Sequence, residues 1–371
     1  MALLGVLLGL ALPLGLLGAA PAGAAASTAA AAPAAPWAGL GTGPGTAARQ
    51  SDGRSWRIMV AGDSLSRGQN GDTTWRQRLR TELLRQGEQV TLVGPRTGAT
   101  TRNGAPVWWA DPTFGQVDHH DALGGTTINR QLPDIGGRVA RTQPDVVCVL
   151  LGLNDLRNGY APATVVSRMR AYLTEVLRAR PATTVVLGGL MPSVSFPSGA
   201  PRAGDTAAVN AGYADLVARL RAGGYDAHWA DPAAAAWTPR RDSYDGTHPT
   251  PRGEQVLLRR FGTGLREAGV LSNTPRAPAA TVPWVTGAVA TPRLSGRVAT
   301  ISWGAWTDRL TVTRMLVRIT GPGGRVRILT SGVAATSLRV RLPAGYHSVR
   351  IAPRRNWLQG EYGPARGFRV R

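Results

Sequence analysis

The stretch that decides the fold runs from Arg57 to Ser66 and reads RIMVAGDSLS. It begins as an apolar run with strand character and stops at Gly62-Asp63-Ser64, where turn-forming residues take over. A polar side chain at the carboxyl end of a first strand lies where open α/β sheets bind their ligands. Ser64 is therefore a candidate nucleophile. Gly-Asp-Ser is also the composition of an ordinary turn, and the second glycine of the nucleophile elbow is missing.

Segments of strand and helix character alternate from this stretch to Ala268. Apolar runs predict strands at 56–61, 89–94, 145–151, 183–190 and 226–230. Apolar residues at helical spacing predict helices at 73–86, 126–142, 162–178, 207–222 and 252–268. The alternation predicts a doubly wound α/β domain with a parallel sheet over residues 55–272.

After a linker at 273–283 the periodicity changes to that of short strands. Polar and apolar residues alternate at 297–303, 311–320, 325–329, 338–342 and 346–351, with Gly- and Pro-containing turns between them. This series predicts an all-β sandwich over residues 284–371.

The bulk composition suits a globular protein that is large enough for two cores. Of its 371 residues, 43% are hydrophobic and 18% are charged. The net charge is +21, and the chain contains no lysine, for which a coding bias is the simplest explanation. The single cysteine, Cys148, lies in an apolar run and cannot form an intrachain disulfide, so we expect a buried hydrophobic residue there.

Residues 1–26 have the features of a secretory signal peptide. An apolar run from Ala2 to Leu17 is followed by small residues that fit a cleavage site, but no basic residue precedes the run. An uncleaved membrane anchor is the alternative, although the run is short and Pro13 interrupts it. Residues 27–54 are rich in Ala, Pro and Gly, which predicts a flexible linker. We therefore expect a secreted, extracellular protein, with association with the cell wall as a further option.

Three further polar clusters meet the chemical needs of acyl transfer, although each is also ordinary turn or capping chemistry. Gly125 precedes a predicted helix, Asn154 follows a buried strand, and Asp245 and His248 stand just before the last helix. A serine nucleophile needs a base, for which His248 is suited, and the base needs an orienting carboxylate, which Asp245 can supply. The backbone N–H groups of Ser64 and Gly125 and the Asn154 amide can donate to an oxyanion.

Four blocks in chain order resemble the SGNH (GDSL) hydrolase family: Gly62-Asp63-Ser64-Leu65, Gly125, Gly152-Leu153-Asn154-Asp155 and Asp245-Gly246-Thr247-His248. The resemblance implies a flavodoxin-like three-layer α/β/α fold. It implies Ser64 as nucleophile, His248 as base and Asp245 as its partner. It also implies an oxyanion hole made by Ser64, Gly125 and Asn154, and no metal or organic cofactor.

A second resemblance concerns one branch of this family. The run Val90–Gly94, followed by His120-Asp121, resembles the acetylxylan-esterase-like branch. That branch usually has His-Glu-Gly where this chain has His120-Asp121-Ala122, which weakens the implied carbohydrate substrate.

The long loop at 95–121 leaves two interpretations open. His119 and His120 with Asp118 and Asp121 could be ligands of a metal ion, but they lack the spacing of a known zinc site, and a structural or cleft-lining role is favoured. Trp108-Trp109 could stack on a substrate or fix the loop to the domain.

The C-terminal part resembles a fibronectin type III domain through Trp303 and Tyr346. Residues 274–371 contain 16 arginines and two acidic residues, a net charge of +14. In Arg325-Val326-Arg327 and Arg339-Val340-Arg341, alternation predicts arginines that project from one sheet face. This is either a solvated basic face or a site that attaches to an anionic cell-wall polymer or membrane surface. Nucleic acid fits the charge but not an exported protein, so none is expected as a partner.

The sequence as a whole predicts a secreted serine esterase that hydrolyses carboxylic esters through an acyl-enzyme. Short acyl esters, such as acetyl groups on an O-acetylated polysaccharide, are the leading substrates. A lipase or phospholipase-like acyl hydrolase is the alternative, because a fold does not fix a substrate. A cell-wall-binding protein without turnover is less favoured, because binding alone does not need Ser64, Asn154, Asp245 and His248 together.

Overall fold

The computed structural model describes residues 37, 40–45, 55–69, 72–98, 112–194, 204–277, 289–303, 312, 314–332, 335–355 and 358–371. The predicted signal peptide at 1–26 and the pair Trp108-Trp109 lie outside these residues, as do parts of the predicted linkers at 27–54 and 273–283.

A six-stranded parallel sheet forms the centre of the first domain, in the order β2-β1-β4-β5-β6 with β3 paired to β1. The five predicted apolar runs became β1 (Trp56–Gly62), β2 (Val90–Val93), β4 (Val146–Leu150), β5 (Thr184–Gly188) and β6 (Ala227–Ala230). The two-residue strand β3 (Asp121–Ala122) was not predicted, because it is too short to show a period and begins at the end of the predicted loop. Every residue of β4 and β5 is buried, as expected for strands that are covered on both faces. This is the strand order of a flavodoxin-like sheet, and it confirms the predicted parallel α/β domain.

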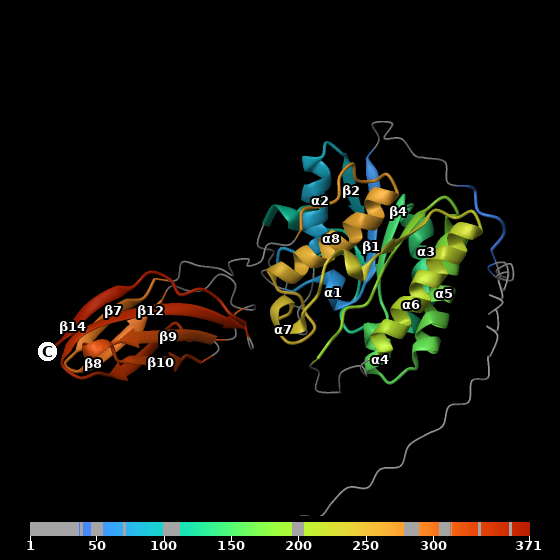
Figure 1. Cartoon of the computed structure of the whole chain (residues 1–371). Coiled ribbons are helices and arrows are strands. Elements are labelled where there is room, and N and C mark those ends of the chain that lie inside the picture. The colour runs from blue at the N-terminus through green and yellow to red at the C-terminus, as the bar shows by residue number, and fades with distance from the viewer. Residues whose placement is uncertain are drawn as a thin grey trace, which may run out of the picture. The chain divides into compact units, whose positions relative to one another are not determined.

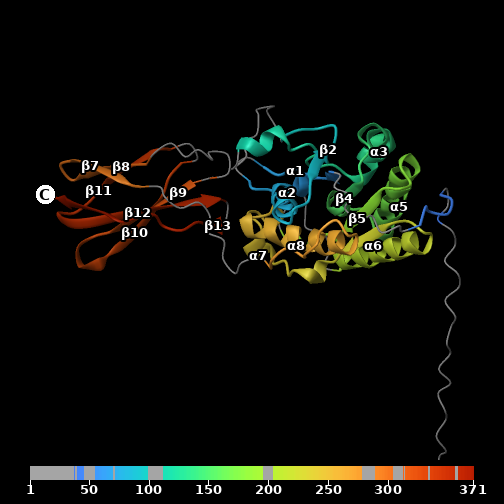
Figure 2. The ribbon, with the colours of Figure 1, turned by 90° about the horizontal axis from the view of Figure 1, so that it is seen from above.

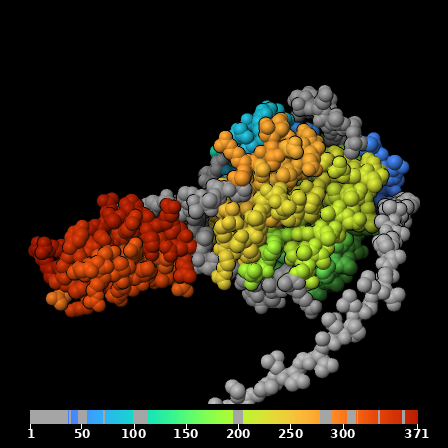
Figure 3. All heavy atoms as spheres, in the orientation of Figure 1, coloured from blue at the N-terminus to red at the C-terminus, as the bar shows by residue number. Residues whose placement is uncertain are grey.

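Helices cover both faces of the sheet (Figures 1 and 2). α2 (Trp75–Arg85) and α8 (Pro251–Glu267) lie on one face, while α3 (Ile128–Thr142), α5 (Pro162–Ala179) and α6 (Asp205–Ala222) lie on the other. Figure 3 shows the same elements with all heavy atoms drawn. The result is the expected three-layer α/β/α arrangement.

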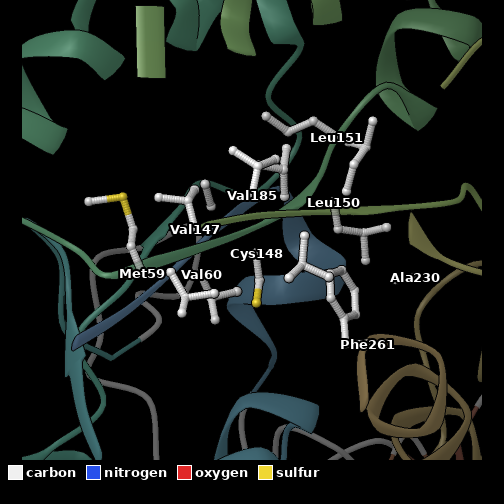
Figure 4. Packing of buried hydrophobic residues seen from close by; sticks show 14 of the residues in the cluster. Met59, Val60, Val147, Cys148, Leu150, Leu151, Val185, Ala230 and Phe261 are labelled. Carbon is white, nitrogen blue, oxygen red and sulfur yellow. The ribbon is translucent and has the colours of Figure 1, made fainter. Parts of the chain in front are cut away.

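The core between these layers is apolar and tightly packed. The rings of Trp75 on α2 and Phe261 on α8 stack with their centroids 4.3 Å apart. Cys148 is fully buried, and Figure 4 shows its thiol between Val60 and Phe261. Burial raises the pKa of this thiol far above its usual range, so Cys148 is an inert core residue, as the sequence predicted.

Several short elements were not expected from the sequence, because they are too short to show a period. They are α1 (Ser64–Arg67), the 3-10 turns at Pro112–Gln116, Pro232–Ala234 and Pro322–Gly324, α4 (Leu153–Arg157) and α7 (Pro239–Asp242). α1 and α4 follow directly on β1 and β4, at the carboxyl edge of the sheet. None of the helices in the described ranges combines the length and apolarity that a bilayer crossing requires.

The C-terminal domain is all-β and antiparallel. A five-stranded sheet contains β9 (Arg314–Thr320), β10 (Val326–Thr330), β12 (Gly345–Arg355), β13 (Leu358–Gln359) and β14 (Arg366–Val370). A three-stranded sheet contains β7 (Thr291–Ser295), β8 (Val298–Ser302) and β11 (Ser337–Arg341). Inward residues of both sheets, such as Ile301, Val317 and Val349, belong to one buried cluster, as expected for a sandwich.

The two residues that suggested a fibronectin type III domain, Trp303 and Tyr346, differ in burial. Trp303 is buried and donates from Nε1 to the Ala335 carbonyl at 3.0 Å, whereas Tyr346 is 65% exposed. The all-β class is therefore confirmed, and the fibronectin type III likeness stays a prediction.

The arginines of both predicted pairs are exposed, but the apolar residue between them is buried in one pair only. Arg339 and Arg341 are exposed on either side of buried Val340 in β11. Val326 is 49% exposed, because it lies on the outer side of β10, whereas Leu329 of the same strand packs against the core of the sandwich.

Candidate active site

Ser64 stands at the first turn after β1, on the carboxyl edge of the sheet. Asp63 caps α1 by accepting a hydrogen bond from the Leu65 N–H at 2.9 Å, which fixes the turn that presents Ser64. The turn is tight, because a Cβ on Gly62 would lie 2.4 Å from the Ser66 Oγ. Only glycine fits at position 62.

The structure brings the side chains of Ser64, His248 and Asp245 into contact, in that order. The Ser64 Oγ lies 3.0 Å from the Nε2 of His248, across 184 positions of sequence. The Nδ1 of the same ring lies 2.7 Å from the Oδ2 of Asp245. These are the distances that a nucleophile, its base and an orienting carboxylate need.

Asp245 is held by its own loop. Its Oδ1 accepts hydrogen bonds from the backbone N–H groups of Thr247 at 3.1 Å and His248 at 2.8 Å. Burial by itself would raise the pKa of Asp245, but the hydrogen bond and charge of His248, together with these N–H groups, bring it below its usual value. Asp245 is therefore a carboxylate at neutral pH and favours the His248 tautomer with a proton on Nδ1.

Asn154 reaches the same edge of the sheet from α4. The chain enters α4 through Gly152, which has a φ of +119°, a value that favours glycine. A Cβ at this position would also lie 2.4 Å from the Tyr213 hydroxyl, so no larger residue fits. The Asn154 side chain donates from Nδ2 to the Asp63 Oδ2 at 3.0 Å. Arg157 donates from Nη1 to the Asn154 Oδ1 at 2.9 Å. The amide is thus fixed at both ends, so its nitrogen and oxygen cannot exchange places.

Asp63 is a buried acid next to the nucleophile. Burial raises the pKa of Asp63 to about 6, against the opposing effects of the Leu65 N–H, His248 and Arg157. Asp63 is therefore ionised at neutral pH and becomes protonated in mild acid.

Gly125 lies in the loop between β3 and α3 and has a φ of +70°. The Leu123 N–H and the Gln131 side-chain amide both donate to the Gly62 carbonyl, at 2.9 Å and 2.8 Å. These bonds tie the loop to the end of β1 that presents Ser64. All five residues predicted for the site therefore belong to segments that meet at one edge of the sheet.

His120 is part of the loop framework. Its Nδ1 accepts from the Ala122 N–H at 3.0 Å, and its Nε2 donates to the Gly98 carbonyl at 2.6 Å. Burial, reinforced by the Arg76 charge, lowers the pKa of His120 to about 2, so the ring is neutral. Both ring nitrogens are occupied, which supports the structural interpretation over the metal-binding one.

The neighbouring acids have structural partners as well. Asp121 is buried and forms ion pairs with Arg138 at 2.8 Å and with Arg96, and Asp118 accepts from the Gly98 N–H at 2.8 Å. In the described ranges, no three His, Cys, Asp or Glu side chains are grouped as metal ligands would be.

A family model decides what kind of protein carries this geometry. Residues 60–256, more than half of the chain, match the model of the GDSL-like Lipase/Acylhydrolase family. The chain belongs to this family. It is accordingly a serine carboxylic ester hydrolase, and the SGNH (GDSL) resemblance seen in the sequence is confirmed.

Solved structures with a similar fold are remote in sequence. A carbohydrate esterase family 3 protein from Talaromyces cellulolyticus has 21% identity and a TM-score of 0.46, over 57% of this chain and 97% of that one. A family 3 carbohydrate esterase from Clostridium thermocellum has 21% identity and a TM-score of 0.47, over 58% and 96%. The esterase EstA from Pseudoalteromonas sp. has 13% identity and a TM-score of 0.41, over 57% and 97%. No curated protein matches the chain, and the assignment rests on the family model.

Sequence reasoning about this GDSL-type site missed Asp63 and Arg157. Asp63 could have been found as an acid that continues an otherwise apolar strand. Arg157 lies three residues after Asn154, the spacing at which side chains meet on one helix face. The five-residue helix α4 is too short to be predicted from the sequence, so this contact was not expected.

Proposed function

We propose that this GDSL-type hydrolase cleaves esters through Ser64 as nucleophile, His248 as general base and Asp245 as the carboxylate that orients the base. The observation that carries the proposal is the unbroken series of contacts from Ser64 Oγ to His248 Nε2 at 3.0 Å and from His248 Nδ1 to Asp245 at 2.7 Å.

The reaction follows from these contacts. His248 Nε2 takes the Ser64 proton as Oγ bonds to the ester carbonyl carbon, and Asp245 stabilises the imidazolium. The tetrahedral intermediate then collapses, and the alcohol leaves with the proton from Nε2. Water repeats the sequence on the acyl-enzyme: His248 takes a proton from the water and returns it to Ser64, and the acid is released.

The oxyanion is held by donors that are fixed before the reaction. We assign this role to the backbone N–H groups of Ser64 and Gly125 and to the Asn154 amide. Asp63 and Arg157 fix the amide, so that its second N–H needs no reorientation as charge develops.

The substrate that we propose is a short acyl ester, such as an acetyl group on a carbohydrate. The sequence resemblance to the acetylxylan-esterase-like branch supports it. The departure at Asp121-Ala122 falls on β3, where Asp121 forms an ion pair with Arg138 and Ala122 lies in register with Gly62 of β1. A lipase or phospholipase-like acyl hydrolase is the second candidate.

Secretion is proposed from the apolar segment and small residues at 1–26.

Hydrolysis of p-nitrophenyl acetate, butyrate and palmitate by three proteins tests the proposal. Ser64→Ala should lose at least about four orders of magnitude in kcat on every ester. Ser66→Ala is the matched control, because the buried Ser66 Oγ has no hydrogen-bond partner among the described residues, and this variant should keep the wild-type rate. Equal activity of wild type and Ser64→Ala would remove Ser64 as nucleophile. A preference for palmitate would favour the lipase alternative.

A further inference from the structure

The described part of the C-terminal sheets has almost no negative charge. Its residues between 289 and 371 include 14 arginines and a single acidic residue, Glu361. A surface with this balance repels itself and attracts anions.

The outer face of the five-stranded sheet brings arginines together in pairs. In the register of β9 and β12, Arg318 lies directly opposite Arg350, and Arg314 lies directly opposite Arg354. Like charges at such positions destabilise an antiparallel pair of strands. None of the residues that share this face on the described strands is acidic. Between Arg318 and Arg350, the repulsion therefore lowers the stability of the sheet until an anion binds.

The contacts of the central pair hold the guanidinium groups without neutralising them. Arg318 lies over the Tyr362 ring, 6.0 Å from its centroid. Arg350 donates from Nε to the Gly363 carbonyl at 2.9 Å. A ring and a carbonyl fix the positions of the two charges and add no anion.

An aromatic ring extends this face. Tyr346 is 65% exposed and lies over Gly367, in register with Arg369 on β14. The face thus combines paired cations with an open ring on a flat sheet.

The outer face of the three-stranded sheet differs in arrangement. Arg293 and Arg339 lie on either side of Thr300, so a strand separates them and they are about 10 Å apart. The two faces carry the same kind of charge, but in the described strands only the five-stranded sheet has arginines directly opposite one another.

We propose that the outer face of the five-stranded sheet around Arg318, Arg350 and Arg369 binds an acidic polysaccharide through its carboxylate groups. A carboxylate between Arg318 and Arg350 accepts from both guanidinium groups and removes their repulsion. Arg369 on β14 lies on the same side of the sheet, in register with Tyr346, so a polymer with repeated charges meets a further cation beside the pair. The open Tyr346 ring offers a flat surface for a sugar ring.

Other polyanions fit this face less well. A bilayer would require a broad apolar centre, whereas the exposed Ile328 lies to one side of Arg318, on the edge strand β10, and Arg350 lies to the other. Single-stranded nucleic acid needs a series of aromatic rings for successive bases, whereas this face has one fully open ring. The inference stands apart from the esterase reaction and does not depend on it.

Retention of the full chain on immobilised polygalacturonate tests the proposal. Arg318→Gln/Arg350→Gln is compared with Arg293→Gln/Arg339→Gln, which removes the same charge from the other sheet. The first variant should bind about tenfold more weakly than wild type and the second within about twofold. Tyr346→Ala, at an exposed position, should also weaken binding. Hydrolysis of p-nitrophenyl acetate monitors folding in every variant.

Three outcomes would overturn the proposal. An equal loss in both double variants would mean that net charge alone is responsible, and no loss in the first would remove the face. Tighter binding to phosphatidylglycerol vesicles or to oligo-dT than to polygalacturonate, at the same salt concentration, would replace the polysaccharide with another occupant.

Discussion

Arginine is used differently in the two domains. In the α/β domain, Arg138 binds Asp121, Arg168 binds Asp155 and Arg252 binds Asp242, and each of these carboxylates is fully buried. In the C-terminal sheets, Arg318 faces Arg350 instead. The first three arginines therefore fix the framework of the catalytic domain, whereas Arg318 and Arg350 present charge at a protein surface.

The difference shows why the overall charge of +21 is a poor guide to function. The net charge counts the arginines in excess of acids over the whole chain, but it does not say which guanidinium groups have a carboxylate beside them. What matters is whether a carboxylate lies within reach, which depends on strand register and loop packing rather than composition.

The largest expected effect is the loss of a framework arginine. Arg138→Met leaves the buried Asp121 with Arg96 as its one remaining ion-pair partner in the described structure, and should lower the free energy of unfolding by about 3 kcal/mol. Urea denaturation measures this value. The double variant Arg138→Met/Asp121→Asn should recover part of the loss, because the buried charge is gone. A change below about 1 kcal/mol would show that this pair is not structural.

A buried acid at the active site should make stability depend on pH. Because the folded-state pKa of Asp63 is raised from 3.8 to about 6, the folded protein holds a proton that the unfolded chain releases between these values. Stability from this group is therefore lost as the pH rises from 3.8 to about 6, by about 3 kcal/mol in total. Asp63→Asn lacks this loss.

Thermal unfolding of wild type and Asp63→Asn from pH 4 to pH 8 checks the prediction. The stability difference should move in favour of the variant as the pH rises and become constant above about pH 6. A difference that does not change with pH would mean that Asp63 titrates normally.

An arginine that touches the reactive groups should affect rate more than stability. Arg157→Met removes the hydrogen bond to Asn154 Oδ1 and frees the amide to rotate. We expect kcat to fall about tenfold with KM nearly unchanged, equivalent to about 1.4 kcal/mol of barrier. Arg157→Lys should restore part of the rate. Arg219→Met, on the exposed side of α6, is the control and should leave kcat unchanged. A rise in KM alone would place Arg157 in substrate binding instead.

The smallest expected effect concerns the exposed arginine pairs. Arg318→Gln/Arg350→Gln should raise stability by about 0.5 kcal/mol at low salt, because it removes a like-charge pair. The gain should shrink as salt screens the repulsion. Calorimetry at several salt concentrations measures both effects, and a gain that is independent of salt would exclude an electrostatic origin.

The sequence predicted those features that repeat or cluster along the chain. The strands of the parallel sheet and the amphipathic α5 were visible because apolar residues recur over many positions. Ser64, Asn154, Asp245 and His248 were found because each follows or precedes a clear element. β7 and β14 were missed, since Pro292 and Gly367 interrupt their alternation.

Contacts between distant segments could not be predicted in this way. The bond between Asn154 and Asp63 joins residues 91 positions apart, and only the parallel pairing of β1 with β4 brings them together. The Arg318–Arg350 pair likewise depends on a register that no local pattern fixes.

The triad joins a local pair to a distant residue, and this has a consequence for refolding. Asp245 and His248 belong to one short loop, which an antiparallel bridge between Ser243 and Pro249 closes. Ser64, which contacts His248, lies 184 positions earlier in the chain. During refolding, esterase activity should therefore return only when the sheet is fully assembled, after the secondary-structure signal has recovered. The rate at which activity returns would then measure the slowest folding step.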